Sequence, residues 1–254
     1  MINLNTIIQQ DCIEFMKTLP NECIDLVFAD PPYFASGTKK GWEEKRFKGI
    51  DENWDYLNGK DIDEFNTAWL TECRRILKNE GTIWVCGTFH NIYSVGHCLS
   101  NLGFTIINDI ILFKPNAFPD ISQRKFTSSH ENLIWAKKEK TSKYFFDYKK
   151  AKLSASEIDL LKIEGSQMRS VWGIPFKISE SVDHPSQKSL SLLKRIVELC
   201  SKPGDLIFDP FIGSGTTAVA AKMLGRKWLG CELEQKYLDI TNKRLSGTQT
   251  MLFI

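Results

Sequence analysis

The chain has little that would place it in a membrane or in an oxidising compartment. None of its apolar runs approaches the ~20 residues that a membrane-spanning helix needs. The N-terminal MINLNTIIQQDC has the features of neither a signal peptide nor a transit peptide. The seven cysteines are odd in number and form no C-x-x-C pair. We therefore expect a cytoplasmic protein with buried thiols, no membrane contact and no metal site.

The chain also has little net charge. Its formal charge is +2 at pH 7, so any contact with nucleic acid must come from local clusters of Lys and Arg. Such clusters occur in SGTKKGWEEKRFKG, with Trp42 and Phe47 interleaved, and in NAFPDISQRKF. The lysines and arginines of these clusters are the candidate phosphate contacts: Lys39, Lys40, Lys45, Arg46, Lys48, Arg124 and Lys125.

Short apolar runs alternate with amphipathic stretches along the whole chain. IDLVFAD and GTIWVCG are apolar without alternation, which is typical of strands buried on both faces of a parallel sheet. FTIINDIILFK and ENLIWAKK are close enough in the chain to pair antiparallel. The pattern predicts one domain over residues 1–254, an α/β fold with a seven-stranded, doubly wound, mostly parallel sheet and one antiparallel strand.

Two long segments lack this periodicity. Residues 35–60 are polar and rich in Gly and Lys, and residues 114–185 mix Lys, Ser, Pro and aromatic residues. A compact domain rarely carries such long irregular segments without using them. We expect residues 35–60 to form one functional insert, directly after the stretch VFADPPYF, and residues 114–185 to form a second insert that recognises nucleic acid.

A glycine-rich turn in DLIFDPFIGSGTTAVAAKMLGRKWLGCEL predicts a nucleotide-binding strand–turn–helix–strand unit. One strand ends at Asp209, Gly213 and Gly215 form the turn, and a second strand ends at Glu232. The third glycine of the dinucleotide fingerprint and the Gly-Lys-Ser/Thr of a P-loop are both missing. Asp209 would repel a pyrophosphate and suits a cationic ligand such as S-adenosylmethionine, whose ribose hydroxyls Glu232 would bind. The simpler alternative is a tight turn followed by a helix-capping glutamate.

The stretch VFADPPYF places a carboxylate, two prolines and an aromatic ring directly after a strand. The amine of adenine N6 or cytosine N4 is a poor nucleophile, because its lone pair is delocalised into the ring. Asp30 and the Pro31 carbonyl would accept its two N–H bonds as the nitrogen becomes tetrahedral. Tyr33 would stack on the base, which must be flipped out of a duplex to reach this position. A proline-capped strand end is the non-functional alternative.

Four motifs together resemble the S-adenosylmethionine-dependent DNA amino-methyltransferases: ADPPYF, DPFIGSGTTAVAAKMLGRKWLGCELEQKY, HPSQKSLSLLKRIV and IIQQDCIEF. DPPY precedes the glycine motif, which is the permuted order of the family's β group. GIDENWD, WLTECRRILK, GTFHNIYSVG and SVWGIP are similar to the branch with GANTC-type, cell-cycle-regulated and GATC-type adenine methyltransferases. The resemblance implies a Rossmann-like fold and methylation of adenine N6 in a specific short DNA sequence.

The resemblance also implies roles for individual residues. The catalytic set is Asp30, Pro31, Pro32 and Tyr33. The cofactor-binding set is Asp11, Cys12, Lys188, Asp209, Phe211, Gly213, Ser214, Gly215, Thr216 and Glu232. Within this set, Asp11 and the Cys12 backbone would meet the adenine of the cofactor. The turn after Asp209 would line its methionine end, and Lys188 would close over it.

The resemblance has one departure in these motifs and leaves other functions open. The family usually has proline where this chain has Ser189. Cytosine N4 is the first alternative target, and methylation of RNA or of a protein glutamine is the next. A nicotinamide-dependent dehydrogenase and a non-catalytic DNA-binding subunit are readings from other classes. DNA is the expected partner, and the resemblance leaves room for a homodimer and for a cognate restriction endonuclease acting on the same site.

Overall fold

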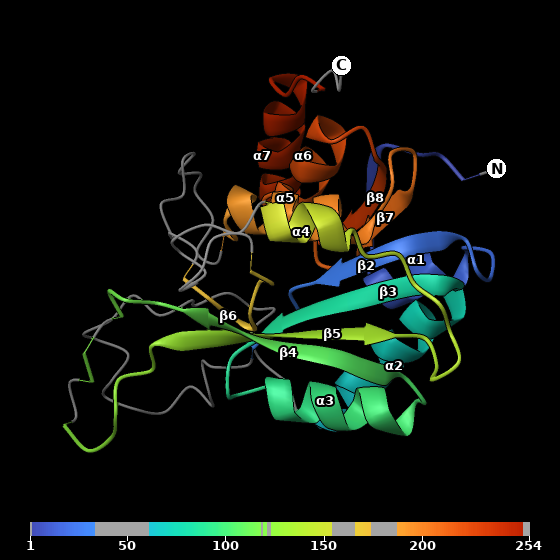
Figure 1. Ribbon diagram of the computed structural model, residues 1–254. Helices are drawn as coiled ribbons and strands as arrows, with labels where there is room; N and C mark the ends of the chain where they lie inside the picture. The colour runs from blue at the N-terminus through green and yellow to red at the C-terminus, as the bar shows by residue number, and fades with distance from the viewer. Residues whose placement is uncertain are drawn as a thin grey trace.

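The computed structural model describes residues 2–33, 61–117, 119–120, 123–153, 166–173 and 187–250. These residues build an eight-stranded sheet with helices on both faces (Figure 1). The strands lie in the order β1–β8–β7–β2–β3–β5–β4–β6. Strands from the two ends of the chain are therefore neighbours near the middle of the sheet.

The strands are β1 (Thr6–Gln9), β2 (Ile24–Ala29), β3 (Leu77–Gly87), β4 (Thr105–Phe113), β5 (His130–Lys137), β6 (Val171–Trp172), β7 (Leu206–Asp209) and β8 (Lys227–Glu232). β5 runs antiparallel to both β3 and β4, whereas the other pairs are parallel. This confirms the mostly parallel α/β sheet with one antiparallel strand. The predicted strand number was one too low, because β6 is only two residues long and too short to show a period.

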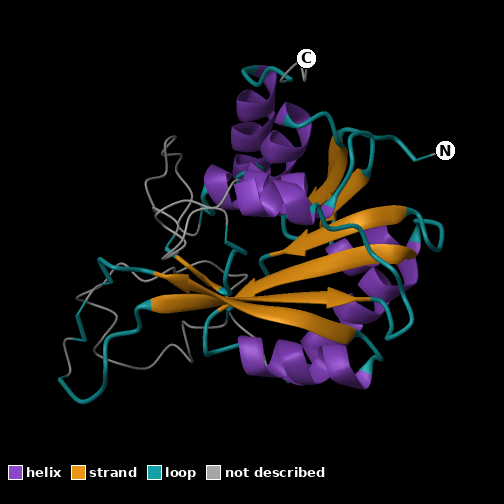
Figure 2. Cartoon of the chain, viewed as in Figure 1, coloured by secondary structure: helices purple, strands orange, loops and turns teal. Residues whose placement is uncertain are grey.

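The helices are α1 (Cys12–Lys17), α2 (Ile62–Ile76), α3 (Ile92–Asn101), α4 (Tyr148–Leu153), α5 (Leu190–Cys200), α6 (Thr216–Met223) and α7 (Gln235–Ser246). Figure 2 shows helices packed above and below the strands. Side chains of α1, α2 and α3 share one apolar core with alternate residues of the sheet, and those of α4, α5, α6 and α7 share a second core. The chain is therefore doubly wound, as its alternation of strands and helices predicted.

Strand β2 shows how the two cores are separated. Leu26 and Phe28 belong to the core under α5 and α6, while Val27 and Ala29 belong to the core under α1 and α2. Successive strand residues point to opposite faces, so a strand that is buried on both sides must be apolar at every position. Asp30 continues this alternation and lies on the face that α5 covers.

Most of the candidate functional residues gather at one edge of the sheet. The carboxyl ends of β1, β8, β7, β2, β3 and β4 share this edge, and the antiparallel β5 begins there. In open α/β sheets, ligands bind beyond the carboxyl ends of the strands, where the winding reverses. This edge is therefore where a site is expected.

Candidate active site

The glycine turn between β7 and α6 is clamped by α7. Gly215 has φ +79, and a Cβ atom there would overlap the side chain of Thr241. Thr241 Oγ1 donates to the Gly213 carbonyl oxygen at 2.9 Å, and Arg244 donates to the Ser214 carbonyl oxygen and to Thr216 Oγ1. The backbone of the turn is thus held from behind by side chains of α7, and only glycine fits at position 215.

Asp209 ends β7 beneath this turn and is buried, with 3% of its surface exposed. Its Oδ1 accepts from the Phe211 backbone N–H at 2.9 Å, and its Oδ2 accepts from the Thr217 hydroxyl at 2.5 Å. Burial raises the pKa of Asp209 to about 7; the two hydrogen bonds oppose this rise, and the charges of Asp30 and Glu232 add to it. A cation beside Asp209 would therefore stabilise its ionised form.

Glu232 ends the neighbouring strand β8 and holds two parts of the site together. Its Oε2 accepts from the Gly213 backbone N–H at 3.0 Å, and its Oε1 accepts from the N–H groups of Leu233 and Glu234 at 2.8 and 2.9 Å. Burial raises the pKa of Glu232, and these backbone bonds work against the rise. The carboxylate thus contacts both the glycine turn and the chain that enters α7. Its predicted bond to a ribose stays a prediction.

The adenine side of the predicted cofactor site lies after β1. Asp11 Oδ1 accepts from the N–H groups of Ile13 and Glu14 at 3.0 and 3.1 Å and so caps α1. Cys12 is buried, and burial, reinforced by the charge of Asp11, raises the pKa of its thiol well above the ordinary value. Gln9 pairs with Glu232 across the sheet, which brings this helix start to the same edge as Glu232.

Phe211 completes the predicted cofactor set from the other side of the turn. Its ring meets Trp69 of α2 edge to face, with 5.4 Å between the ring centroids, and lies 6.3 Å from the ring of Phe65. These aromatic contacts hold the Phe211 side chain against α2.

The DPPY segment follows β2, and its aspartate is already hydrogen-bonded at both oxygens. The Tyr33 hydroxyl donates to Asp30 Oδ1 at 2.6 Å, and Lys188 Nζ donates to Asp30 Oδ2 at 2.7 Å and to the Tyr33 oxygen at 2.9 Å. Lys188 was predicted to close over the cofactor, and in this structure it contacts Asp30, the predicted catalytic carboxylate. Its role toward a cofactor stays a prediction.

Three further residues belong to this network, and sequence reasoning did not single them out: Cys86, Lys114 and Glu131. Glu131 is 8% exposed, and Lys114 donates to its Oε1. Its Oε2 lies 3.8 Å from Lys188 Nζ and 3.7 Å from Cys86 Sγ, which also lies 3.4 Å from the Tyr33 oxygen. The sequence held one signal that could have found Glu131: it is a glutamate in an apolar strand, two residues before Leu133 and so on the same face of the strand as that core residue.

The alternation of the strands explains why these residues meet. Cys86, Leu112 and Leu133 belong to the core beneath α5, so Lys114 and Glu131, two residues along from Leu112 and Leu133, lie on that same face. Lys188 directly precedes the capping residue of α5. Five separate chain segments thus converge on the α5 side of the sheet edge.

Neighbouring charges outweigh the effect of burial on Lys188 and on Glu131. Burial by itself lowers the pKa of Lys188, but the charges of Asp30 and Glu131 and the hydrogen bond to Asp30 raise it above the ordinary lysine value. Burial by itself raises the pKa of Glu131, but Lys188 and Lys114 lower it below the ordinary value. Burial is the main cause that raises the pKa of Tyr33. Its hydroxyl therefore keeps the proton that it donates to Asp30.

The predicted DNA contacts are only partly within the described residues. Arg124 and Lys125 are exposed in the connection between β4 and β5, and the neighbouring Phe126 is 99% exposed. The candidates at 39, 40, 45, 46 and 48 lie outside the described residues, as do the whole of the predicted insert 35–60 and part of the insert 114–185. All of these DNA contacts and both insert roles stay predictions.

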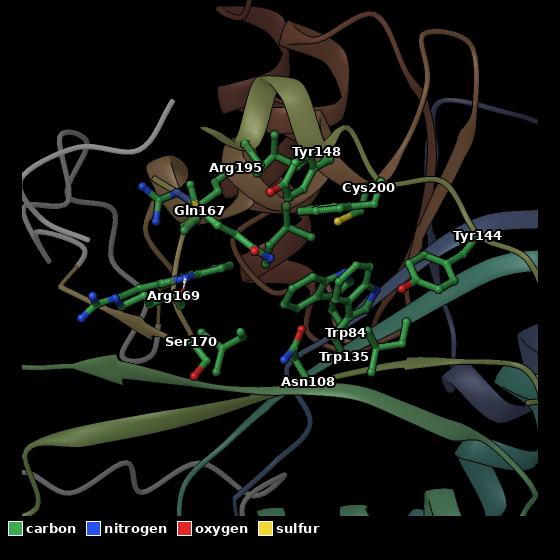
Figure 3. A pocket seen from close by; sticks show the side chains of 18 residues that line it. Trp84, Asn108, Trp135, Tyr144, Tyr148, Gln167, Arg169, Ser170, Arg195 and Cys200 are labelled. Atoms are coloured by element: carbon green, nitrogen blue, oxygen red, sulfur yellow. Dashed lines mark hydrogen bonds between the residues drawn. The ribbon is translucent and has the colours of Figure 1, made fainter. Parts of the chain in front are cut away.

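A separate cavity of about 300 Å³ lies on the α5 face, farther from the sheet edge (Figure 3). Aromatic rings line it, among them Trp84 and Trp135, which stack with 4.9 Å between ring centroids. Arg195 lies over the ring of Trp172, 5.0 Å from its centroid. This cavity contains none of the predicted site residues, so we place the chemistry at the sheet edge and not in the cavity.

Two further findings bear on the sequence predictions. All seven cysteines are free. Within the described part of the chain, no group of His, Cys, Asp and Glu side chains is arranged to hold a metal ion, and no helix is long and apolar enough to cross a membrane.

The fold and the two motifs at its edge are those of a nucleic-acid methylase, and comparison with known proteins identifies the family. Residues 24–243 match the family N6_N4_Mtase, described as DNA methylase, and the chain belongs to this family. It is 44% identical to the type II methyltransferase M.HinfI of Haemophilus influenzae, over 95% of this chain and 68% of that protein. It is 38% identical to M2.DpnII of Streptococcus pneumoniae, over 96% of this chain and 91% of that protein.

Solved structures agree with this assignment. The complex of M1.HpyAVI with S-adenosylmethionine is 25% identical and has a TM-score of 0.66, over 94% of this chain and 98% of that chain. The cytosine-N4-specific PvuII DNA methyltransferase has a TM-score of 0.65 over 96% of this chain and 94% of that chain, and its 21% identity shows a shared fold alone. The predicted family, a DNA amino-methyltransferase, is confirmed.

Proposed function

We propose that this DNA methylase transfers a methyl group from S-adenosylmethionine to N6 of adenine in a specific short DNA sequence. One observation carries the proposal. Asp30 of the DPPY segment directly follows β2, Asp209 before the glycine turn is the last residue of β7, and these two strands are neighbours in the sheet. A cofactor held at the turn would therefore lie beside an amine held at Asp30, which is the arrangement that direct methyl transfer needs.

The residues of the glycine turn fit a cationic cofactor. Asp209 is buried, and its two hydrogen-bond donors, the Phe211 N–H and the Thr217 hydroxyl, are neutral. Because neither donor carries a positive charge, burial raises the pKa of Asp209 to about 7. S-adenosylmethionine, when bound, supplies an electrophilic methyl group on a sulfonium ion. Its positive charge would lower the pKa of Asp209, and Glu232 on the next strand would accept from the ribose hydroxyls.

The DPPY segment fits a planar amine. Asp30 offers a carboxylate oxygen, and the φ of Pro31 is fixed near −65° by its ring, so its carbonyl oxygen is preorganised as a second acceptor. These acceptors would hold the two N–H bonds while the lone pair of the nitrogen forms the new bond to the methyl carbon and the sulfur–carbon bond breaks, leaving neutral S-adenosylhomocysteine. The nitrogen would then release one proton through Asp30 to solvent, which leaves a neutral secondary amine. Preorganised acceptors of this kind contribute roughly 10²–10³ in rate.

Cytosine N4 is the second candidate target, and a specific observation keeps it open. The PvuII enzyme, described as cytosine-N4-specific, shares the fold with a TM-score of 0.65, so the fold does not distinguish the two bases. The DPPY tetrapeptide resembles the adenine type and supports adenine. Methylation of RNA or of a protein glutamine would be expected with an Asn-Pro-Pro-Tyr segment, which this chain does not have.

Partners and location are part of the proposal. The type II relatives support a cognate restriction endonuclease that acts on the same DNA site. The free thiols support a reducing, cytoplasmic location. A homodimer, with the cofactor site in each copy, is proposed from the resemblance alone.

The test is methyl transfer from labelled S-adenosylmethionine to unmethylated genomic DNA, with the modified base identified by nucleoside mass spectrometry. We expect N6-methyladenine from the wild type and a loss of at least 10²–10³ in rate for Asp30→Ala. Asp239→Ala, which removes an exposed carboxylate of α7, is the matched control. N4-methylcytosine would favour the second target, and absence of any methylated base would overturn the proposal.

A further inference from the structure

Lys188 stands in the way of the amine that the proposed reaction needs at Asp30. Its Nζ donates to Asp30 Oδ2 at 2.7 Å, and the Tyr33 hydroxyl occupies Oδ1 at 2.6 Å. An amine nitrogen becomes positively charged as it accepts a methyl group. A cation within hydrogen-bond distance of the same carboxylate opposes that charge at close range, in a site with little water. Lys188 therefore has to leave Asp30 Oδ2 before the methyl transfer.

Glu131 is the carboxylate that lies ready to receive Lys188. Its Oε2 is 3.8 Å from Lys188 Nζ, and the side chains of both residues are only 10% exposed. Lys114 donates to the other oxygen of Glu131 and so turns Oε2 toward Lys188. A buried ammonium group moves at low cost only from one carboxylate to another, because an uncompensated charge in the interior is strongly unfavourable.

The charges of the cluster support such a transfer. Asp30 and Glu131 are balanced by Lys114 and Lys188, and the Tyr33 hydroxyl and Cys86 thiol fill the remaining space between them. Moving Lys188 from Asp30 to Glu131 leaves this balance unchanged. It also exposes one oxygen of Asp30 to the incoming base.

We propose that Glu131 is a positioning residue of the methylase: it holds Lys188 away from Asp30 when the target base occupies the DPPY segment. The inference rests on the proposed function, since it assigns a step within that reaction. Asp30 is then locked by Lys188 in the free enzyme and released as the base arrives. Glu131 acts through Lys188 and touches neither the base nor the cofactor.

The test is a double-mutant cycle on the full chain. Glu131→Gln keeps the size of the side chain and an acceptor for Lys114, and removes the charge that attracts Lys188. We expect its single-turnover rate, at saturating DNA and cofactor, to fall roughly 10- to 100-fold, with a KM for DNA within about two-fold of the wild type. In a Lys188→Gln background the same change should alter the rate by less than about two-fold. Glu131→Asp should recover part of the loss.

Two controls separate this role from a structural one. Glu198→Gln removes a carboxylate of α5 that pairs with Lys150 of α4, and it should keep the wild-type rate. Thermal unfolding of each variant reports whether Glu131→Gln is folded. Equal losses from Glu131→Gln in the wild-type and Lys188→Gln backgrounds would overturn the proposal, as would a wild-type rate for Glu131→Gln.

A measurement on the wild-type protein makes the test independent of variant folding. Carbon-13 at the ε-position of Lys188, assigned by comparison with Lys188→Gln, reports the surroundings of its ammonium group by NMR. Addition of S-adenosylhomocysteine and DNA should shift this signal, and an unchanged signal in that complex would overturn the inference. Failure of the proposed function has a different signature, since the wild type itself would then transfer no methyl group to DNA.

Discussion

Two buried carboxylates at the same sheet edge, Asp209 and Glu131, have pKa values shifted in opposite directions. Asp209 is 3% exposed and bonded only to neutral donors, and burial raises its pKa to about 7. Glu131 is 8% exposed and lies between Lys114 and Lys188, which outweigh its burial and lower its pKa. Among the described residues, the proposed cofactor half, around Asp209 and the glycine turn, thus lacks a positive charge that a ligand would bring. The proposed catalytic half, around Asp30 and Glu131, contains its own cations, Lys114 and Lys188. The proposed cofactor half would gain its positive charge from the bound ligand. In the proposed catalytic half, Lys188 would have to leave Asp30 before the base can bind there.

The two halves also differ in how the chain assembles them. The cofactor half comes mainly from β7, α6 and β8, which follow one another over residues 206–232. The catalytic half draws Asp30, Cys86, Lys114, Glu131 and Lys188 from distant segments. Substitutions in the first half should therefore act on folding and cofactor binding, and those in the second on the reaction.

The largest expected effect is on the pH dependence of stability through Asp209. Because its folded-state pKa is raised to about 7 from 3.8, its stabilising contribution is full below about pH 4 and is lost as pH rises through 7. In Asp209→Asn the side-chain oxygen can still accept from the Phe211 N–H, the amide can still bond the Thr217 hydroxyl, and the side chain cannot ionise. Relative to it, the wild type should lose on the order of 4 kcal/mol of unfolding free energy between pH 4 and pH 8. Urea unfolding of both proteins across that range measures the difference.

Glu131→Gln is the matched control, because the wild type should differ from it with the opposite dependence of unfolding free energy on pH. The folded-state pKa of Glu131 is lowered, so its contribution is present above the ordinary value of 4.5 and is lost as pH falls through the lowered value. Relative to this variant, the wild type should lose stability on acidification. The difference in unfolding free energy between wild type and Asp209→Asn should change with pH in the opposite direction to that between wild type and Glu131→Gln. The same direction for both would contradict the comparison between the two carboxylates.

Next in size is the glycine turn. Gly215→Ala forces a side chain into a backbone with φ +79 and against Thr241, and we expect a loss of about 3 kcal/mol in unfolding free energy. Gly225→Ala is the control, since Gly225 has φ +70 and no atom within 4 Å of an added Cβ. It should cost about 1 kcal/mol from backbone strain alone. Urea denaturation would measure both, and equal losses would show that the clamp by α7 does not matter.

Glu232→Ala tests the cofactor half directly. Removing the carboxylate takes away its bonds to the Gly213, Leu233 and Glu234 N–H groups and the proposed bonds to the ribose. We expect S-adenosylmethionine to bind about 2–3 kcal/mol more weakly by calorimetry, with DNA affinity little changed. Glu234→Ala, whose side chain does not cap α7, is the control. Unchanged cofactor affinity in Glu232→Ala would contradict the assignment of Glu232.

The proposed DNA contacts at Arg124 and Lys125 are expected to act through phosphates. Replacing either by Ala should weaken binding by about 1 kcal/mol for every DNA sequence and reduce the salt slope by about 0.9. Lys227→Ala is the control, because this exposed residue begins β8 at the opposite edge of the sheet. Binding isotherms at several salt concentrations supply the slopes. A change in which sequence is methylated, with the slope intact, would assign the residue to base contacts.

The smallest effect is expected at Ser189, where the family usually has proline. Ser189 has φ −63, which proline adopts without strain, and its buried hydroxyl has no hydrogen-bond partner in the described structure. Ser189→Pro should raise the unfolding free energy by about 0.5–1 kcal/mol, because it restricts the unfolded chain. Ser189→Ala separates the removal of the hydroxyl from the effect of the ring. A destabilised Ser189→Pro would show that the chain before α5 needs the freedom that proline removes.

Much of the fold was predictable because its signals are local. Apolar runs and helical spacing located most strands and helices, and one close pair of strands predicted the antiparallel member. Strand β6 and helix α4 were missed, since β6 has only two residues and the six residues of α4 bury only Ala151, so neither shows an apolar period. Their positions depend on packing against β4 and α5, which no local pattern records.

The sequence by itself determined the sheet class, the glycine turn and the residues of DPPY, because each depends on neighbours within a few positions of the chain. Only the tertiary structure decided that Glu131, Lys114 and Cys86 surround Lys188 and Asp30. Their meeting depends on strand order, on the antiparallel direction of β5 and on which face each alternating side chain takes. The physical reason is that charge pairing acts through space between residues that are far apart in sequence, so no spacing along the chain encodes it.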